Sequence, residues 1–467
     1  MQRFQGLELT LAAQQWWLRH AGPAILAQVK SGAPLQNLKH VPRLNDHVDS
    51  YYAATAHAAR THPRLSETVE CDVCVVGGGI AGCSSALHLA QRGYRVVLLE
   101  DKRIGWGASG RSGAQALPGF ACGQDKLTGL IGPEAARALW DVSVEGLALM
   151  RRLIAEHRID CDWIDGQMQV ALKPRHCQEL QTLRTQLERD YAYRSLRWYE
   201  RRELASLLET DRYLGGLYDA NSGHLHPLNY TLGLAAATER AGARIFEDTR
   251  ALRFDNGGGV RVHTRQGAVR CRHLVLCGNA SLDGTAPALA RKIIGVATYI
   301  VATESLGAER ARRLITNNMA VTDMNWVLDY FRRSADHRLL FGGRVSYSGL
   351  DPANTARLTR ARMLRVFPQL AGTKIEYSWD GYLDITLNRA PHFGRLAPEV
   401  YFLQGFSGHG IALTGMAGKL IAEAVAGTAE RFDVFARIPH RDFPGGPLLR
   451  RPALVLAMLY YRLRDLS

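Results

Sequence analysis

The spacing of hydrophobic residues between positions 69 and 102 changes twice, and each change marks a new element. An unbroken apolar run, Val73–Val76, predicts a buried strand. A helical stretch of small residues follows, then a break at Gly93, and then a second apolar run that ends at Glu100. Three glycines in the spacing G-x-G-x-x-G lie between the first strand and the helix, namely Gly77, Gly79 and Gly82. This order predicts a strand, a tight turn, a helix and a parallel strand, which is the unit that binds a dinucleotide.

Each residue type in this unit has a physical reason. Gly77 permits a sharp exit from the strand, Gly79 lets backbone N–H groups approach a pyrophosphate, and Gly82 lets helix and strand pack closely. The positive end of the helix, at Ile80 and Ala81, then faces the phosphates. Glu100 can accept both hydroxyl groups of a ribose, and Asp101 and Lys102 lie beside it at the same edge.

A second glycine-rich segment, residues 104–115, reads IGWGASGRSGAQ. A loop after the second strand of a nucleotide fold runs beneath the phosphates and toward the far end of the cofactor. Ser109 and Arg111 are therefore candidate ligands, with Gly107, Ala108 and Ser112 beside them.

A third glycine loop lies near the end of the chain. The segment Gly405–Gly410, GFSGHG, separates a predicted strand, Val400–Gln404, from a small-residue helix, Ile411–Ala426. The amino end of this helix can stabilise negative charge that develops on a bound group.

The remaining pattern predicts a second, sheet-rich part. Segments with a period of two predict strands of an antiparallel sheet, at Gly166–Leu172, Ile294–Glu304, Trp326–Arg332 and Arg338–Gly343. The apolar run Leu274–Cys277 predicts a strand that returns to the nucleotide sheet, whereas residues 50–70 are expected to cross the surface. The fold class is therefore α/β, with a Rossmann-like nucleotide domain interrupted by an inserted antiparallel-sheet domain. The predicted boundaries are an N-terminal helical extension at 1–50, the nucleotide domain at 51–165, 227–290 and 381–440, the substrate domain at 166–226 and 291–380, and a C-terminal helical tail at 441–467.

Composition and charge limit the class of protein and the partners that we expect. The 467 residues are 46% hydrophobic and 22% charged, as in soluble globular proteins. No apolar run approaches the length of a membrane span, so we expect a cytoplasmic protein. The net charge of +14 comes from dispersed Lys and Arg residues, and no nucleic-acid partner is expected.

The eight cysteines show no disulfide framework, and we predict no metal site. Cys71 and Cys74 are expected to be buried and to point to opposite faces of a strand. His224 and His226 have the spacing of a metal-binding pair on a strand, but no matching carboxylate or cysteine pair accompanies them.

Several segments together resemble the FAD-dependent amine oxidases of the D-amino-acid oxidase and glycine oxidase superfamily, and within it the gamma-glutamylputrescine oxidases. They are YYAATA at 51–56, CDVCVVGGGIAGCSSALHLA at 71–90, IGWGASGRSGAQ at 104–115, LLFGGR at 339–344, GFSGHG at 405–410, FPGG at 443–446 and YYRLRD at 460–465. The likeness covers residues 50–467.

The resemblance implies a nucleotide domain of the glutathione-reductase type that binds FAD end to end, with the flavin ring between the two domains and GFSGHG beside its pyrimidine ring. It implies further cofactor contacts from Arg250, Ala251, Cys277, Gly278, Gly381, Gly408, His409, Gly410, Ile411 and Thr414. It implies substrate contacts from Gln115, Gln167, Gln169, Tyr299 and Ala412. His409 is the candidate for direct chemistry, with structural support of the flavin as the alternative.

Departures from the family pattern sharpen the expectation. The last cysteine is Cys277 and the loop 105–115 has no histidine, so the known covalent links to FAD are absent and noncovalent FAD is predicted. Relatives that bind an α-carboxylate carry a lysine two residues after GHG, and this chain has Ala412 there. The resemblance therefore implies oxidation of an amine, with gamma-glutamylputrescine preferred, by hydride transfer to flavin and reoxidation by O2 to H2O2. Alternatives are a secondary or cyclic amino acid as substrate, such as sarcosine, proline or pipecolate, and modification of transfer RNA.

Two interpretations stay open for the segment 452–466. It packs on the body of the protein, or it lies on a membrane surface as a peripheral contact. The oligomeric state cannot be read from the sequence.

Overall fold

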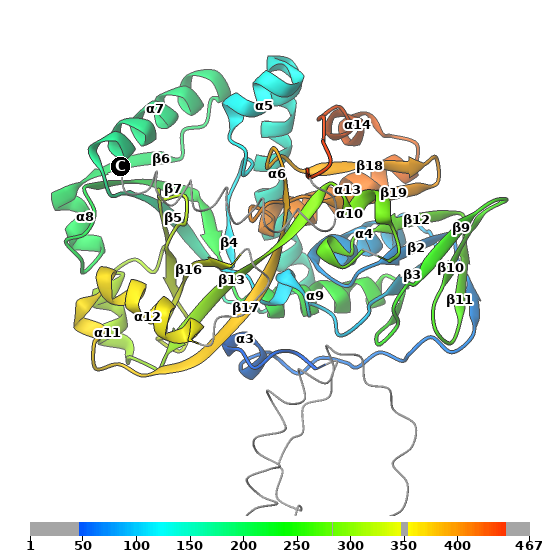
Figure 1. Ribbon diagram of the computed structural model, residues 1–467, viewed down its shortest axis with the longest axis horizontal. Helices are drawn as coiled ribbons and strands as arrows, with labels where there is room; N and C mark the ends of the chain where they lie inside the picture. The colour runs from blue at the N-terminus through cyan, green and yellow to red at the C-terminus, as the bar shows by residue number, and fades with distance from the viewer. Residues whose placement is uncertain (1–45, 283, 347–353, 445–467) are drawn as a thin grey trace, which may run out of the picture. The chain divides into compact units, whose positions relative to one another are not determined.

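The computed structural model describes residues 46–282, 284–346 and 354–444. The chain divides into two compact units, 1–47 and 48–467, and the fold below is that of the second unit (Figure 1). Most of the predicted N-terminal extension and C-terminal tail lies outside the described residues, and so does the segment 452–466.

The predicted nucleotide unit forms the centre of a six-stranded sheet with the order β18-β19-β12-β2-β3-β8. All neighbouring pairs are parallel except β18 with β19. The strands are β2 (Val73–Val76), β3 (Val96–Leu99), β8 (Arg244–Phe246), β12 (His273–Leu276), β18 (His392–Ala397) and β19 (Val400–Gln404).

Both faces of this sheet are covered, which explains why β2 and β3 read as unbroken apolar runs. Helices pack on one face, namely α4 (Ile80–Gln91), α6 (Pro133–His157), α9 (Pro227–Arg240) and α13 (Ile411–Val425). A small four-stranded sheet packs on the other face, namely β1 (Thr68–Glu70), β9 (Arg253–Asn256), β10 (Val260–His263) and β11 (Ala268–Cys271).

The alternating segments form a second, nine-stranded sheet with the order β17-β13-β16-β15-β14-β5-β7-β4, in which β6 also pairs with β7. Its strands are β4 (Gln115–Ala116), β5 (Ile164–Ala171), β6 (Leu196–Glu200), β7 (Gly215–His224), β13 (Ile293–Thr303), β14 (Ala320–Asp323), β15 (Tyr330–Arg333), β16 (Leu339–Ser346) and β17 (Ile375–Thr386). One face packs against α8 (Arg201–Leu207), α11 (Ala308–Leu314) and α12 (Thr355–Val366). The opposite face meets the glycine loop that follows β3.

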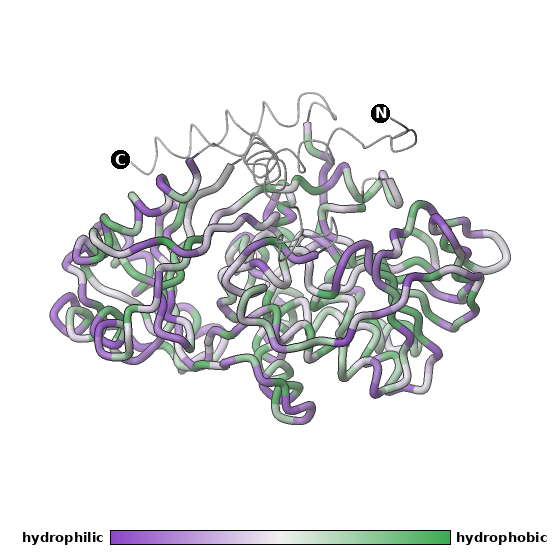
Figure 2. The backbone as a smooth tube through the Cα atoms, turned by 90° about the horizontal axis from the view of Figure 1, so that it is seen from below, coloured by the Kyte–Doolittle hydropathy of each residue, from purple (hydrophilic) through white to green (hydrophobic). Residues whose placement is uncertain are grey.

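The remaining helices lie around these sheets (Figure 1). They are α3 (Tyr51–Ala54), α5 (Gln124–Ile131), α7 (Pro174–Tyr191), α10 (Pro287–Ala290) and α14 (Glu430–Ala436), with short 3-10 turns at Ala108–Gly110, Asn279–Ser281 and Pro368–Leu370. In Figure 2 the hydrophilic stretches lie mostly on outer loops and helices, whereas hydrophobic stretches run through the interior.

Several expectations need correction. The second sheet is not purely antiparallel, because β14 pairs in parallel with β5. Residues 51–54 do not cross the surface but form a short helix, in which Tyr51 and Tyr52 are 3% and 0% exposed. The strand expected from Trp326 starts only at Tyr330.

The expected orientation of Cys71 and Cys74 was also wrong. Both are buried in the same apolar cluster, and both thiols interact with Cys271. Strand alternation does not apply to this pair because β2 begins only at Val73. All eight cysteines are free thiols.

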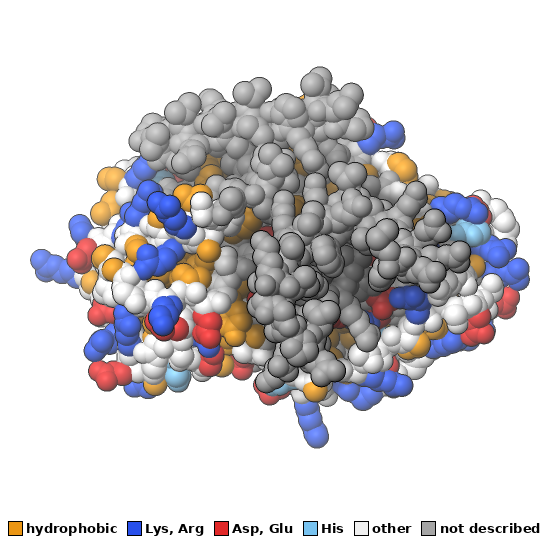
Figure 3. Space-filling model, turned by 60° about the horizontal axis from the view of Figure 1, so that its bottom comes forward, with side chains coloured by type: hydrophobic (Ala, Val, Ile, Leu, Met, Phe, Trp, Pro, Cys, Tyr) orange, Lys and Arg blue, Asp and Glu red, His pale blue; other side chains and the backbone are white. Residues whose placement is uncertain are grey.

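Two observations concern the surface. On the face shown in Figure 3, acidic side chains lie among the Lys and Arg side chains, and the basic residues are spread around the rim. Among the described residues no single helix is long and apolar enough to cross a membrane, and α13 and α14 meet that criterion only as a pair bent by 116°.

Candidate functional site

Loops from parallel strands meet at one edge of the six-stranded sheet. Gly77 follows β2, Glu100 follows β3, Cys277 follows β12 and Gly405 follows β19. Since these strands are parallel, their carboxyl ends lie at the same edge, where dinucleotides bind in open α/β sheets. The three glycine-rich segments predicted from the sequence are therefore brought together.

The first turn has the close contacts that only glycine allows. Gly77 has a φ of +110°, and a Cβ there would lie 2.6 Å from the carbonyl oxygen of Cys277. A Cβ on Gly82 would lie 1.8 Å from the carbonyl oxygen of Gly77, so helix α4 could not approach β2. Ser109 accepts a hydrogen bond at 3.0 Å from the Ile80 N–H and thereby joins the second glycine segment to the amino end of α4.

The carboxylate of Glu100 is fixed by two backbone donors. The Gly78 N–H donates to Oε2 at 2.6 Å, and the Lys102 N–H donates to Oε1 at 2.9 Å. Each oxygen keeps a second lone pair for a ribose hydroxyl. Burial raises the pKa of Glu100 to about 7, although the two backbone donors lower it.

This raised pKa predicts a pH dependence of cofactor binding. Ribose hydroxyls donate to the carboxylate, and protonation below pH 7 removes acceptor capacity, so FAD affinity should fall about tenfold per pH unit between pH 7 and 5. We would titrate the apoprotein with FAD at pH 8, 7, 6 and 5 and follow flavin fluorescence. Glu100→Gln is the matched control and should bind weakly at every pH. An affinity of the native chain that does not change across this range would contradict the assignment.

The other predicted contacts of the adenosine end gather around Glu100. The Thr249 N–H donates to the Glu100 carbonyl at 2.8 Å, which brings Arg250 and Ala251 alongside. Arg250 Nη1 lies 3.8 Å from Asp101 Oδ2. Cys277 and Gly278 close the turn opposite Gly77. Backbone groups dominate this end, which suits a cofactor whose phosphates and ribose accept and donate hydrogen bonds.

In the second glycine segment, four consecutive carbonyl oxygens are held by surrounding groups. Arg111 O accepts from Trp379 Nε1 at 3.0 Å, and Ser112 O accepts from the Tyr52 hydroxyl at 3.0 Å. Gly113 O accepts from Arg332 Nε at 3.4 Å, and Ala114 O accepts from the Leu225 N–H at 3.2 Å. Ala114 has a φ of +63°, a left-handed conformation that is costly for a residue with a side chain. The loop is thus fixed in one conformation.

The side chain of Arg111 offers a test of whether a cofactor fits here. It is 6% exposed, its guanidinium lies 3.9 Å from the centre of the Trp106 ring, and its Cβ packs at the position of Gly381. Nε donates to Trp106 O at 2.6 Å and Nη1 lies 3.7 Å from Asp380. Nη2 is buried and has no partner among the described residues. A buried guanidinium nitrogen without an acceptor fits a site completed by a bound group.

The third glycine loop is tied to the nine-stranded sheet through Asp384 in β17. The Gly405 N–H donates to Asp384 Oδ2, and the Ser407 N–H donates to the Asp384 carbonyl at 2.9 Å. Ser407 and Gly408 both have positive φ values, +54° and +89°, and Gly408 is exposed. At the start of α13, Thr414 Oγ1 donates to Gly410 O at 2.7 Å.

His409 is oriented by one bond. Its Nε2–H donates to the carbonyl oxygen of Pro118 at 2.9 Å, and burial lowers the pKa of the ring. The imidazole is therefore neutral at pH 7, with Nδ1 unprotonated. His224 and His226 have structural partners, because His224 Nε2 donates to Asn318 O and His226 Nδ1 accepts from the Asn229 N–H. Among the described residues no group of three His, Cys, Asp or Glu side chains is placed to hold a metal ion.

Three predicted or adjacent polar residues meet on one face of the nine-stranded sheet. Thr322 in β14 lies beside Gln169 in β5, and Thr322 Oγ1 donates to Gln115 Oε1 at 2.8 Å. Gln115 Nε2 donates to Val321 O at 3.1 Å. Met168 and Val170 lie in the core on the opposite face, as the alternation predicts. We call Gln115, Gln169 and Thr322 the amide face.

Other candidate substrate residues lie elsewhere. Gln167 shares the strand face but is 2% exposed and donates to Met168 O. Tyr299 in β13 pairs with Asp380 in β17, and the neighbouring pair is Ile300 with Trp379. Because side chains alternate along a strand, Tyr299 points to the other face of the sheet from Ile300 and Trp379. Ala412 is 1% exposed, and its backbone lies against Gly146 of α6.

Four residues of this site were not among the sequence candidates, namely Tyr52, Thr322, Arg332 and Asp384. Each acts through a partner distant in the chain, so no local spacing identifies it. Tyr52 lay within a noted segment, YYAATA, but its burial became apparent only in the structure.

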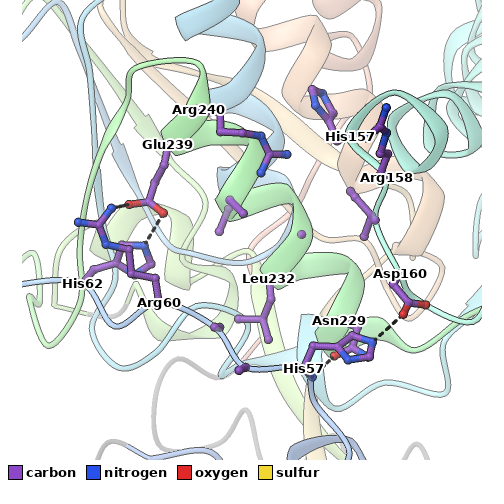
Figure 4. Close-up of a pocket in the computed structure, with 16 residues that line it drawn as sticks. His57, Arg60, His62, His157, Arg158, Asp160, Asn229, Leu232, Glu239 and Arg240 are labelled. Atoms are coloured by element: carbon purple, nitrogen blue, oxygen red, sulfur yellow. Dashed lines mark hydrogen bonds and ion pairs between the residues drawn. The ribbon is translucent and has the colours of Figure 1, made fainter.

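A separate cavity of about 330 Å³ lies between the end of α6, helix α9 and residues 57–62 (Figure 4). His57 pairs with Asp160 at 3.3 Å and Arg60 pairs with Glu239 at 3.4 Å. The remaining cations, Arg158 and Arg240, stand at the carboxyl ends of α6 and α9, where basic residues balance the helix dipole. The charges of this cavity are thus accounted for without a ligand.

The parallel sheet, its glycine turn and the acid after β3 define a dinucleotide-binding fold with a second, sheet-rich part. A family model described as FAD dependent oxidoreductase matches residues 72–424, and the chain belongs to this family. It is an FAD-dependent oxidoreductase.

Curated relatives match almost from end to end. The chain is 42% identical over 423 residues to gamma-glutamylputrescine oxidoreductase of Escherichia coli, covering 90% of this chain and 99% of that protein. It is 40% identical over 425 residues to a probable oxidoreductase, OrdL, of Haemophilus influenzae, covering 90% and 98%.

Solved structures share the fold. Glycine oxidase of Geobacillus kaustophilus superposes with a TM-score of 0.66 at 21% identity, over 76% of this chain and 95% of that one. L-proline dehydrogenase of P. horikoshii superposes with a TM-score of 0.63 at 21% identity, over 78% and 94%.

Proposed function

We propose that this enzyme oxidises gamma-glutamylputrescine to an imine, which water hydrolyses to an aldehyde and ammonia, with O2 as the electron acceptor that is reduced to H2O2. The proposal is supported by the 42% identity to gamma-glutamylputrescine oxidoreductase over 90% of the chain. The structural observation that carries it is the amide face, Gln115, Gln169 and Thr322. None of the three has a charged side chain as a hydrogen-bond partner in the described part of the chain.

A neutral polar surface suits the neutral part of this substrate. The amide that joins the glutamyl group to putrescine needs one donor and one acceptor, and a carboxamide side chain supplies both. An α-carboxylate next to the reacting carbon would instead require a cation close to the cofactor. We therefore assign Gln169 as the residue that binds the substrate amide.

The roles of the other residues follow from their contacts. When bound, FAD supplies the acceptor for the hydride that leaves the carbon next to the amine nitrogen. In our proposal the residues chosen from the sequence hold that cofactor without a covalent bond: Gly77, Gly79, Gly82 and Glu100 at the adenosine and phosphate end, Ser109 and Arg111 along the loop, and Gly408–Thr414 at the far ring. His409 is anchored on Pro118 and supports the loop rather than accepting a proton from the substrate.

The first experiment is anaerobic reduction of the purified yellow protein by a panel of amines. Gamma-glutamylputrescine should bleach the flavin fastest, and air should restore the colour with formation of H2O2. Putrescine and spermidine test the need for the glutamyl group. Bleaching only by sarcosine, proline or pipecolate would overturn the proposal and indicate an α-amino acid substrate. Bleaching without recovery in air would indicate a different electron acceptor.

Replacing Gln169 by Leu tests the amide face. We expect KM for gamma-glutamylputrescine to rise about tenfold with kcat nearly unchanged, because the lost hydrogen bond contributes to binding and not to the hydride step, at about 1 kcal/mol or slightly more. Gln178→Leu, an exposed glutamine on α7, is the matched control and should leave both constants unchanged. A Gln169→Leu enzyme with native KM would remove Gln169 from the site.

A further inference from the structure

Arg332, in β15, carries a buried positive charge without an acidic neighbour. Its side chain is 4% exposed. Nη2 donates to the Tyr52 hydroxyl at 3.0 Å, Nη1 donates to Arg333 O at 3.1 Å and Nε donates to Gly113 O. Among the described residues Arg332 forms no ion pair with a carboxylate, and its charge acts on Asp162 only at longer range. Burying an uncompensated cation is costly, so its presence calls for an explanation.

The histidines around Arg332 do not share the charge. Nη1 of Arg332 lies 3.5 Å from Nδ1 of His224, and the Tyr52 ring contacts the ring of His226. Burial and the nearby guanidinium lower the pKa of both histidines to about 3. The cluster of Arg332, Tyr52, His224 and His226 therefore holds a single positive charge at neutral pH, which is that of the guanidinium.

This charge lies directly behind the second glycine segment. Arg332 holds the carbonyl of Gly113, and Tyr52 holds that of Ser112. In a planar trans peptide the next N–H points away from the carbonyl, so the N–H groups of Gly113 and Ala114 face the other side of the loop. The Gly113 N–H has no hydrogen-bond partner among the described residues, whereas the Ala114 N–H reaches Ser112 Oγ at 3.3 Å.

We propose that Arg332 is a positioning residue: it holds Gly113 O directly and Ser112 O through Tyr52, so that the Gly113 N–H faces the flavin, and it places a fixed positive charge behind these two peptides, so that the negative charge of the reduced flavin is stabilised. The inference rests on FAD binding beside residues 111–115 and does not depend on which amine is oxidised. A preorganised charge in a buried site acts strongly because no solvent must reorganise around it.

The test measures the flavin itself. Sulfite adds to oxidised flavin and produces a negatively charged adduct that bleaches the colour, so its affinity reports the same electrostatic stabilisation without any amine turnover. We expect Arg332→Gln to bind sulfite at least tenfold more weakly and to lower the two-electron midpoint potential by about 30 mV per tenfold loss. Arg332→Lys should keep both values within threefold. Arg333→Gln is the matched control; it removes the neighbouring cation of β15, whose Nε donates to Asn318 Oδ1 and not to the loop, and should change sulfite affinity by less than threefold.

The outcomes separate charge from packing. If Arg332→Gln retains FAD with a native potential and native sulfite affinity, Arg332 has only a structural role and the proposal is overturned. If Arg332→Gln does not retain FAD, the test rests on Arg332→Lys. A flavin midpoint potential that falls in Arg332→Lys, although the positive charge is kept, would overturn the proposal that this charge stabilises the reduced flavin. Failure of every amine to reduce the native enzyme would refute the proposed function but would leave the sulfite result interpretable.

Discussion

Replacing Gly82 by Ala should yield a colourless protein that does not retain FAD. The new Cβ would lie 1.8 Å from the carbonyl oxygen of Gly77, and neither atom can rotate away because the backbone fixes both positions. Helix α4 would have to move off β2, and its amino end would leave the place where the phosphates are expected. We expect at least a hundredfold loss of FAD affinity, measured by the ratio of flavin to protein absorbance after dialysis and by titration of the apoprotein.

The matched control is Gly129→Ala, in the interior of the exposed helix α5. A Cβ at Gly129 meets no atom within 4 Å, and alanine stabilises a helix interior by up to about 1 kcal/mol relative to glycine. This variant should retain full FAD and melt at the native temperature or slightly above it. Retention of FAD at native occupancy by Gly82→Ala would refute the close contact between helix and strand.

Replacing Asp384 by Leu should disable the third glycine loop. Asp384 is 4% exposed and accepts the backbone N–H of Gly405, while its own carbonyl accepts that of Ser407. Leucine would leave the buried Gly405 N–H without this acceptor, which costs about 1 to 3 kcal/mol, whereas the bond from the Ser407 N–H uses the backbone carbonyl and is kept. We expect a loss of kcat of about a hundredfold and weaker FAD retention, both largely rescued in Asp384→Asn, whose carboxamide oxygen still accepts a hydrogen bond.

The raised pKa of Asp384 also predicts how the stability of the fold depends on pH. Burial raises its pKa to about 7, above the value of 3.8 expected for the unfolded chain. The folded state therefore holds a proton that the unfolded state releases, so this group destabilises the fold progressively as pH rises from about 4 to 7. Relative to Asp384→Asn, the native chain should lose about 2 kcal/mol between pH 5 and 7 in urea unfolding. A difference between the two proteins that is constant with pH would show that Asp384 titrates normally.

The parts of the fold that rest on local pattern were predictable. The run Val73–Val76, the glycines at 77, 79 and 82 and the acid at 100 lie within one contiguous segment, so spacing alone specifies the turn and the helix. The alternation of Gln167, Met168, Gln169 and Val170 likewise identified the faces of β5. In both cases the direction of successive side chains repeats with the local backbone, every 2 residues in a strand and every 3.6 residues in a helix.

The rest depends on contacts between distant residues. Arg332 meets Gly113, Asp384 meets Gly405, and Thr322 meets Gln115, and no periodicity relates the members of these pairs. The parallel pairing of β14 with β5 has the same origin, because strand direction depends on how the chain returns and not on its pattern. Cys71 shows a different failure: the alternation of a strand was applied to a residue that lies two positions before β2 begins.

The chain passes between the two sheets four times, from β3 to β4, from β7 to β8, from β12 to β13 and from β17 to β18. No contiguous stretch of the gene therefore encodes the whole nine-stranded sheet alone. Recombination that exchanges one uninterrupted segment would either divide the nine-stranded sheet or carry strands β8–β12 along with it, so in our proposal individual substitutions on the amide face are the more direct route to a new substrate preference. Engineering of this enzyme should accordingly begin with libraries at Gln115, Gln169 and Thr322 rather than with chimeras.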